Sequence, residues 1–311
     1  MSPGFDFDPK NDIPNLEGKV ILVTGGTAGV GARSVVQLAQ RNPAHIYFTG
    51  RNAKSADAVI KKAAATGSKT NVQFLPCDLA SLASVKSAAE KVLAEQSRLD
   101  VLLANAGIMD VPELLTEDGY EMHFGVNYLS HALLIRKLLP LLERTAADPQ
   151  ADVRVVVLTS PGFLAAPSGG IQFDRVKTVQ KFHFLSGLIR YGQSKLADLL
   201  LARELARRYP AILSISVTPG IVDTALVANL STLLRVTSKV SAYLTQGGLI
   251  KPEDGAKSQL WCVGAPKCEV KAGEFYEPVG VHSKVSSKYS TDMELSKRLW
   301  EWADAELKMW M

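Results

Sequence analysis

A short apolar run, a glycine-rich turn and a helical pattern follow one another near the start of the chain. The run at residues 19–24 is rich in β-branched side chains, which is typical of a buried parallel strand. The turn after it carries Gly25, Gly29 and Gly31, and the helical pattern extends to Gln40. Glycine permits positive φ and close approach of a phosphate, and a helix N-terminus offers unpaired N–H groups. The arrangement predicts a nucleotide-binding α/β unit, although methyltransferases and purely structural turns can share it.

Five further apolar runs, each followed by turn residues, alternate with helical patterns. The runs span residues 45–49, 72–76, 99–104, 153–159 and 213–218, and the longest early helical pattern spans residues 118–143. Such alternation predicts an α/β fold, a doubly wound parallel sheet (Rossmann fold) that binds ligands at the carboxyl ends of its strands. No linker, repeat or composition shift divides the chain. We therefore expect a single domain over residues 19–311, preceded by an N-terminal extension at residues 1–18.

A tyrosine and a lysine stand four residues apart, at Tyr191 and Lys195, in a helical pattern that extends to about Tyr209. This spacing puts both side chains on one face of a helix. The pKa of a free tyrosine is about 10, and a nearby ammonium group lowers it by favouring the phenolate. The pair therefore indicates an acid–base site that works near neutral pH. The alternative is a chance pairing on a solvated helix face.

The second apolar run ends in Gly50, Arg51 and Asn52. The end of this strand is where an acidic residue would accept the ribose hydroxyls of NAD, and no carboxylate stands there. Arginine offers several directed donors to a phosphate. Arg51 therefore favours NADP, through its 2′-phosphate; the alternative is an arginine that merely lies on the surface.

Composition excludes several other classes of protein. Apolar residues make up 47% and charged residues 21% of the 311 positions, so the chain can build a core. The net charge of +4 is mild and its basic residues are scattered, which does not favour nucleic acid. The five histidines show no metal spacing, and Cys77, Cys262 and Cys268 are too few for a disulfide framework, which indicates a reducing compartment.

Two stretches bear on membrane association. Residues 1–18 are polar with several prolines, unlike a signal peptide or an anchor. The longest uncharged run, residues 155–173, contains Pro161, Pro167 and three glycines, which disfavours a spanning helix. We therefore expect no membrane span and a cytoplasmic protein.

Seven short motifs occur in a fixed order within residues 17–225, and together they resemble those of the short-chain dehydrogenase/reductase family. They are Thr24-Gly25, Gly29-Val30-Gly31, Asn105-Ala106-Gly107, Asn127, Ser160, Tyr191 with Lys195, and Pro219-Gly220. Residues 273–279 and 295–306 are similar to the ends of retinol-dehydrogenase-like members, which include many fungal oxidoreductases.

The resemblance implies a catalytic tetrad. Tyr191 would give its proton to a carbonyl oxygen, and Ser160 would hydrogen-bond that oxygen. Lys195 would bind the nicotinamide ribose, while Asn127 would hold a water that links the lysine to solvent. Such chemistry is reasonable because hydride transfer to a carbonyl builds negative charge on oxygen, which fixed donors stabilise.

The resemblance also implies an NADP(H) site. The pyrophosphate and its adjoining ribose would be surrounded by Gly25, Thr27, Gly29, Val30 and Gly31, and the 2′-phosphate would be bound by Arg51. The adenine would contact Asp78 and Leu79, and the adenine-side ribose would contact Asn105, Ala106 and Gly107. The nicotinamide half would contact Tyr191, Lys195, Pro219, Gly220, Val222 and Thr224. The alternatives are a turn cap for Asp78, and a helix cap and first turn for Val222 and Thr224. No metal site is implied.

The chain departs from the family pattern between Ser160 and Tyr191. Residues 161–190 form a segment longer than in compact members, and loops of this length are often functional. Pro161 also constrains Ser160 to an extended backbone, which bears on the direction of the serine hydroxyl.

Two stretches are candidates for the wall of a substrate pocket. Residues 161–190 carry Phe163, Phe173, Phe182 and Phe184. Within residues 225–250, apolar positions recur at near-helical spacing, which fits an amphipathic lid over an apolar pocket or, alternatively, ordinary packing of a surface helix. These positions are Leu226, Leu230, Leu233, Val240 and Leu244.

Together these features predict an NADP(H)-dependent oxidoreductase that interconverts a carbonyl and an alcohol on a bulky, apolar small molecule. One alternative is an enzyme of a biosynthetic pathway, as in secondary metabolism, that reduces a C=N or C=C bond or catalyses a cyclisation. Another is a non-catalytic NADP-binding regulator. By resemblance, a homodimer or homotetramer would form through the helices that carry Asn127 and Tyr191.

Overall fold

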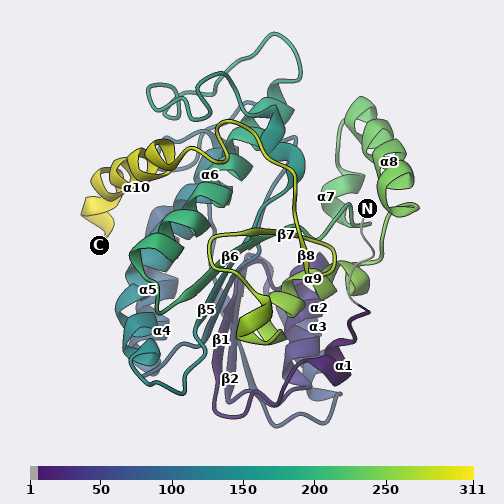
Figure 1. Ribbon diagram of the computed structural model, residues 1–311, viewed down its shortest axis with the longest axis vertical. Coiled ribbons are helices and arrows are strands. Elements are labelled where there is room, and N and C mark those ends of the chain that lie inside the picture. Colours follow the sequence, from purple (N-terminus) through teal and green to yellow (C-terminus); the bar gives the residue numbers. More distant parts are fainter. Residues whose placement is uncertain (1–5) are drawn as a thin grey trace.

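The computed structural model describes residues 6–311, in which eight strands form one sheet in the order β3-β2-β1-β4-β5-β6-β7-β8 (Figure 1). The strands are β1 (Val20–Val23), β2 (His45–Gly50), β3 (Asn71–Pro76), β4 (Val101–Ala104), β5 (Arg154–Leu158), β6 (Leu213–Val217), β7 (Phe275–Glu277) and β8 (Val281–His282). All neighbouring pairs are parallel except β7 and β8. The predicted α/β sheet is therefore confirmed, with β8 as an antiparallel edge strand.

Helices cover both faces of the sheet (Figure 1). On one face lie α4 (Leu82–Glu95), α5 (Ser130–Ala146), α6 (Ser186–Arg208) and α10 (Met293–Leu307); on the other lie α1 (Pro9–Asp12), α2 (Gly29–Ala39), α3 (Ala53–Ala64) and α9 (Pro252–Gly264). Strand β5 shows why the predicted runs are apolar throughout. Val155 and Val157 pack in the core under α4 to α6, whereas Val156 and Leu158 pack under α2 and α9.

The helix predicted from residue 118 begins later. Gly119 adopts φ +82°, and Leu115 and Glu121 form an isolated antiparallel bridge, so residues 118–121 are a turn. The Asp118 carboxylate accepts a hydrogen bond from the N–H of Leu82, at 2.8 Å, and so caps α4. The helix then opens with a wide π-helical stretch, η1 (Phe124–Leu129), and continues as α5.

Residues 6–18 pack closely on the rest of the chain. Phe7, Ile13 and Leu16 are buried in the core beneath α2 and α9. A Cβ atom at Gly264 would lie within 3.2 Å of Ile13 atoms, so α9 approaches this segment as closely as a glycine permits. This segment is therefore part of the packed structure.

The segment between β5 and α6 begins with a 3₁₀ turn, η2 (Pro161–Ala165). Phe163 is buried against Phe275, and Phe173 packs on Trp302 of α10. These two phenylalanines therefore stabilise the core and do not wall a pocket, contrary to the role considered for them from the sequence. Phe184 is 71% exposed.

Two helices, α7 (Ala225–Ala228) and α8 (Thr232–Gln246), stand apart from the main layers at the right of Figure 1. Leu230 and Leu234 pack with Val227 in a small separate cluster. Leu233, Val240 and Leu244 are exposed. These three side chains of α8 therefore neither cover a pocket as a closed lid would nor pack on the core. The chain also contains the short turns η3 (Lys267–Glu269) and η4 (Lys308–Trp310).

None of the helices in residues 6–311 is long and apolar enough to cross a membrane. The same residues contain no group of three side chains placed to bind a metal ion.

Candidate active site

The glycine-rich turn is packed so tightly that side chains are excluded from it. Gly25 and Gly29 adopt φ of +67° and +53°. A Cβ atom at Gly31 would lie 2.4 Å from the carbonyl oxygen of Gly25 and 2.4 Å from Nδ2 of Asn105. The turn after β1 therefore lies directly on the residues that follow β4.

Helix α2 begins at this turn without a capping side chain. Its N-cap residue is Ala28, which has no side-chain oxygen to offer the first N–H groups. The methyl group of Thr224 comes within 3.4 Å of the place where a Cβ of Gly29 would stand. An open helix N-terminus flanked by glycines fits a pyrophosphate, and the residues after β6 lie beside it.

The arginine that follows β2 has no partner among residues 6–311. Arg51 is exposed and makes no hydrogen bond or ion pair with other residues of the described chain 6–311. Gly50 before it lies against Thr27, whose Cγ2 would stand 2.5 Å from an added Cβ. Asn52 after it caps α3 through the N–H of Ser55. Arg51 is therefore the one residue of this trio whose side chain is left for a ligand.

One oxygen of Asp78 caps a turn, as the structural alternative proposed. Oδ1 accepts a hydrogen bond from the N–H of Ala80 at 3.0 Å. Leu79 next to it is buried. Val222 also has a structural role, because its backbone pairs with Ile250 and its side chain fills the space left by Gly255.

A buried network links the first strand to the helix that carries Asn127. Oγ1 of Thr24 accepts hydrogen bonds from the N–H groups of Asn105 and Ala106, at 2.9 and 3.0 Å. It also contacts Nε2 of His131 at 2.8 Å, and Nδ1 of His131 contacts the carbonyl oxygen of Asn127 at 2.7 Å. Burial lowers the pKa of His131 to about 4, so the ring is neutral and donates from Nδ1 to that carbonyl.

Asn127 lies in the π-helical stretch η1 and is fully buried. Its Oδ1 accepts the N–H of Ile108 at 2.8 Å, and its Nδ2 donates to the carbonyl of Ile108 at 3.0 Å and to Oγ of Ser194 at 2.9 Å. π-Helical turns often occur at functional sites. The amide is thus held rigidly between the residues after β4 and helix α6.

Lys195 faces the same space as Asn127. A Cβ atom at Gly107 would lie 3.4 Å from Oδ1 of Asn127 and 3.6 Å from Nζ of Lys195. Nζ donates to the carbonyl of Leu158 at 2.9 Å and to Oδ2 of Asp198 at 2.8 Å. Burial alone would lower the pKa of Lys195, but its neighbours, above all the carboxyl group of Asp198, outweigh burial and the pKa is raised. The lysine is therefore a cation at neutral pH.

Asp198 is a buried carboxylate that the sequence analysis did not single out. Burial raises its pKa to about 7, although Lys195 opposes the shift. Its second oxygen, Oδ1, is buried and has no hydrogen-bond partner among the described residues. The carboxyl beside Lys195 thus changes its charge near neutral pH.

Ser160 and Tyr191 border one small space beside Gly162. A Cβ atom at Gly162 would lie 2.9 Å from Cε1 of Tyr191 and 3.3 Å from Oγ of Ser160. The backbone of Ser160 is extended, with φ −158°, as Pro161 requires. Its Oγ accepts the N–H of Gly162 at 3.1 Å, which leaves the hydroxyl proton free to be donated elsewhere. The hydroxyl of Ser160 and the ring of Tyr191 therefore both lie beside Gly162.

The chain was compared with known proteins. A family model described as short chain dehydrogenase matches residues 19–162. The short-chain dehydrogenase/reductase drtF of Aspergillus calidoustus is 37% identical, over 99% of this chain and 98% of its own. The chain belongs to the short-chain dehydrogenase/reductase family. Human retinol dehydrogenase 11 is 33% identical, over 92% of this chain and 85% of its own, so the enzyme is retinol-dehydrogenase-like. A crystal structure of a protein from Mycobacterium paratuberculosis superposes with a TM-score of 0.71 at 25% identity and covers 98% of both chains.

In this short-chain dehydrogenase/reductase, a buried ion cluster holds the start of α6 beside Tyr191. Arg190 lies 3.3 Å from Oε1 of Glu121 and donates to the carbonyl of Val111 at 2.8 Å. Glu121 also accepts from the ring of His123, whose edge faces the ring of Tyr191 at 6.4 Å between centroids. The cluster therefore fixes the tyrosine relative to the loop after β4.

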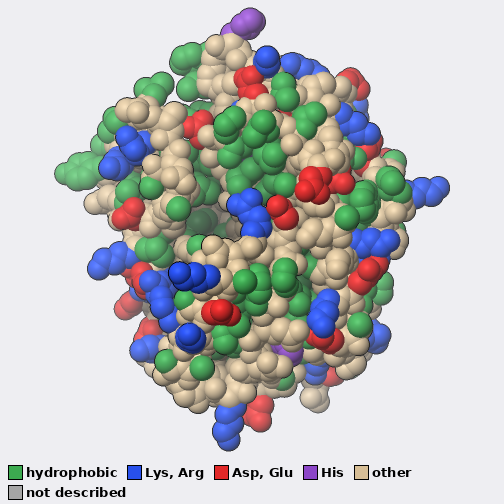
Figure 2. Space-filling view, turned by 180° about the vertical axis from the view of Figure 1, so that it is seen from behind, with side chains coloured by type: hydrophobic (Ala, Val, Ile, Leu, Met, Phe, Trp, Pro, Cys, Tyr) green, Lys and Arg blue, Asp and Glu red, His purple; other side chains and the backbone are tan. Residues whose placement is uncertain are grey.

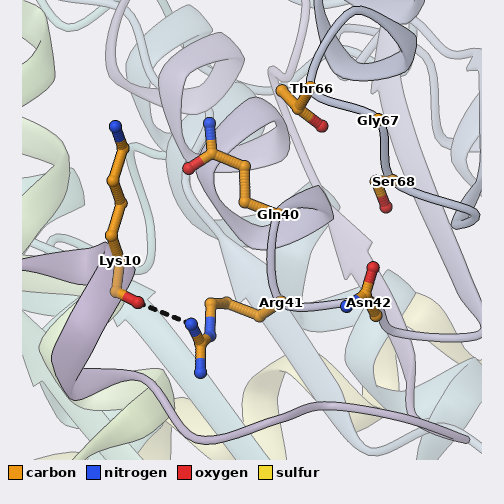
Figure 3. Close-up of a pocket in the computed structure, with 7 residues that line it drawn as sticks. All are labelled: Lys10, Gln40, Arg41, Asn42, Thr66, Gly67 and Ser68. Atoms are coloured by element: carbon orange, nitrogen blue, oxygen red, sulfur yellow. Dashed lines mark hydrogen bonds between the residues drawn. The ribbon is translucent and has the colours of Figure 1, made fainter.

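An open pocket of about 480 Å³ lies far from these residues (Figure 3). It is lined by Lys10, Gln40, Arg41, Asn42, Thr66, Gly67 and Ser68. Lys10 belongs to α1, and the other six residues follow α2 or precede β3, so the pocket lies at the amino ends of the strands. The hydrogen bond drawn in Figure 3 runs from the Arg41 guanidinium to the carbonyl oxygen of Lys10. This pocket is not part of the short-chain dehydrogenase/reductase site.

Several residues that shape the family site were missed by sequence reasoning. Thr24 was noted only as part of a motif, and Ser194 only within the tyrosine–lysine segment. His131 follows Asn127 by four positions, and Asp198 follows Lys195 by three. Both spacings place side chains on one helix face, which is the signal that could have found them.

Proposed function

We propose that this protein is an NADP(H)-dependent oxidoreductase that interconverts an alcohol and a carbonyl on a bulky, apolar small molecule. The observation that carries the proposal is that four side chains lie beside two glycines, Gly107 after β4 and Gly162 after β5. Tyr191 and Ser160 border the space at Gly162, and Lys195 and Asn127 border the space at Gly107. An acid–base tyrosine, a hydroxyl donor and a buried cation are what carbonyl reduction needs from a protein.

Each residue has a distinct task in this proposal. Tyr191 donates its proton to the substrate oxygen in reduction and removes it in oxidation. Ser160 donates a second hydrogen bond to that oxygen, because its own oxygen already accepts from Gly162. The buried cation of Lys195 would hold the ribose hydroxyls. The nicotinamide, when bound, supplies or accepts the hydride.

The residues present fit a dinucleotide with a 2′-phosphate. The uncapped start of α2 at Ala28 would take the pyrophosphate, and the exposed Arg51 would take the 2′-phosphate. The absence of a carboxylate after β2 removes the group that would accept the ribose hydroxyls of NAD.

A bulky, apolar substrate is favoured by the rim of the site. Leu114, Leu164 and Phe184 are exposed on segments that follow the carboxyl ends of β4 and β5. A retinol dehydrogenase is among the similar proteins, and retinol is an apolar alcohol. A small polar substrate turned over far faster than bulky apolar ones would contradict this part of the proposal.

Calorimetric titration with NADPH and with NADH tests the cofactor assignment. We expect NADPH to bind much more tightly, and the preference to be lost in Arg51→Ala. Lys54→Ala is the matched control, since Lys54 is another exposed cation in the first turn of α3. Preference for NADH would overturn the role of Arg51. Binding of neither nucleotide would overturn the proposed function.

Product analysis tests the reaction. With NADPH and a panel of aromatic and polycyclic ketones and aldehydes, we expect alcohols as products. Reduction of a C=N or C=C bond without alcohol formation would favour the alternative class of enzyme. A homodimer or homotetramer in the cytoplasm remains our prediction for its assembly and location.

A further inference from the structure

Helix α8 exposes an apolar stripe on the side that faces away from the protein. Leu233, Val236, Val240, Tyr243 and Leu244 are each between 53% and 76% exposed. Their spacing of three, four, three and one places them on one face of the helix. The buried residues of α8, Leu234 and Ala242, lie on the opposite face. The helix is therefore apolar on two sides, and the outer side packs on nothing among residues 6–311.

The charged side chains of α8 itself have one sign. From Asp223 to Glu253 there is no acidic residue between these two ends, whereas Arg235, Lys239 and Lys251 are basic. The remaining polar side chains of α8 are hydroxyls and one amide. In Figure 2, hydrophobic side chains protrude at the left of the outline, where α8 lies, with Lys and Arg side chains beside them. An exposed apolar stripe on a helix whose own charged side chains are all cations is typical of a helix that lies in the interface of an anionic bilayer.

A second exposed segment packs on the cluster that seats α7 and α8. Leu185 packs against the cluster of Val227, Leu230 and Leu234 that seats α7 and α8. The residue before it, Phe184, is 71% exposed, and Lys181 nearby is an exposed cation. Two segments far apart in sequence thus present aromatic, aliphatic and cationic side chains on one side of the molecule.

We propose that the outer stripe of α8, together with Phe184, is a docking face for anionic lipid membranes. The protein would lie on the bilayer with α8 parallel to the surface and would not cross it. Since α8 follows the carboxyl end of β6, docking would also turn the mouth of the site toward the lipid, a consequence that rests on the proposed function.

A second copy of the chain fits this face less well. A two-fold interface brings the same patch of both subunits together, so Arg235 and Lys239 would meet their own copies. No acidic side chain within residues 224–252 could pair with them. Like charges at an interface oppose association, whereas phosphatidylserine head groups would neutralise these cations.

Vesicle co-sedimentation tests the proposal. The full chain is mixed with vesicles of phosphatidylcholine alone or of phosphatidylcholine with phosphatidylserine. We expect sedimentation with the anionic vesicles and much less with the neutral ones, with the difference reduced at high salt. The double variant Val240→Glu, Leu244→Glu should bind at least about tenfold more weakly, since two apolar contacts become anionic.

Met309→Glu with Met311→Glu is the matched control. Both methionines are exposed, and they lie at the end of α10, on the other side of the molecule from α8 (Figure 1). We expect this variant to bind anionic vesicles like the wild type, and all three proteins to melt at the same temperature. No sedimentation with either vesicle, or equal loss in the control variant, would overturn the proposal. Light scattering that shows a dimer in the wild type and a monomer in the α8 variant would also overturn it, in favour of an interface between copies.

Discussion

The charge of Asp198 gives a pH dependence that replacement by asparagine should remove. The pKa of this carboxyl is about 7 in the folded protein and 3.8 in a model compound. A raised folded pKa means that the protonated carboxyl stabilises the fold at low pH, and that this stability is lost as the pH rises through about 7. The raised pKa of Lys195 adds no change in this window, because the lysine stays protonated throughout.

The magnitude follows from the size of the shift. Each pH unit between the two pKa values changes the free energy of unfolding by about 1.4 kcal/mol. Between about pH 5 and pH 8, wild type should therefore lose about 3 kcal/mol relative to Asp198→Asn. Urea denaturation at a series of pH values measures this difference.

A second buried acid of α6 provides the control. Burial alone would raise the pKa of Glu204, but hydrogen bonds from Arg207 and Arg208 lower it overall. The stability that the ionised carboxylate of Glu204 contributes is lost only as the pH falls well below 5. Glu204→Gln should therefore change the free energy of unfolding equally at pH 5 and pH 8. If the curves of wild type and Asp198→Asn stay parallel over this range, the reasoning about Asp198 is wrong.

Three other perturbations have direct outcomes. Tyr191→Phe should lower kcat by about 10²–10⁴-fold with little change in NADPH affinity, since only the proton donor is lost; a mild effect would exclude it as the acid. Gly31→Ala should weaken NADPH binding at least about tenfold, because its Cβ would stand 2.4 Å from the carbonyl oxygen of Gly25; unchanged calorimetric affinity would contradict the tight turn. Leu299→Ala in α10 should lower the free energy of unfolding, measured by urea denaturation, by about 2–5 kcal/mol, since the side chain is buried. A loss below about 1 kcal/mol would show that the neighbouring side chains close the cavity.

The positions of the site residues could be predicted because parallel strands end at one edge of a sheet. Arg51, Asn105 and Ser160 each follow an apolar run in the sequence, and the sheet brings those ends together. Strands β7 and β8 gave no comparable signal. They contain three and two residues, too few for a periodic pattern, and β8 exists only because it pairs with β7.

Tertiary contacts decided what the sequence left open. Asp118 begins a helical pattern, yet its carboxylate caps α4 and the chain around it turns. The stripe on α8 has the spacing of a core-facing helix, but Leu234 and Ala242 occupy the inner side, so the stripe faces outward. Periodicity shows that a helix has an apolar face, whereas only the neighbours show which face is covered.

The long segment between Ser160 and Tyr191 leaves the site intact because both of its ends are fixed. Oγ1 of Thr159 donates to the carbonyl of Lys195 at 2.6 Å, and Nζ of Lys195 donates to the carbonyl of Leu158 at 2.9 Å. A Cβ atom at Gly192 would lie 2.8 Å from backbone atoms of η2, so the 3₁₀ turn rests directly on α6. Loop closure becomes only slowly more costly with length. Residues can therefore be added between these points and packed on α10 while the serine and the tyrosine stay side by side.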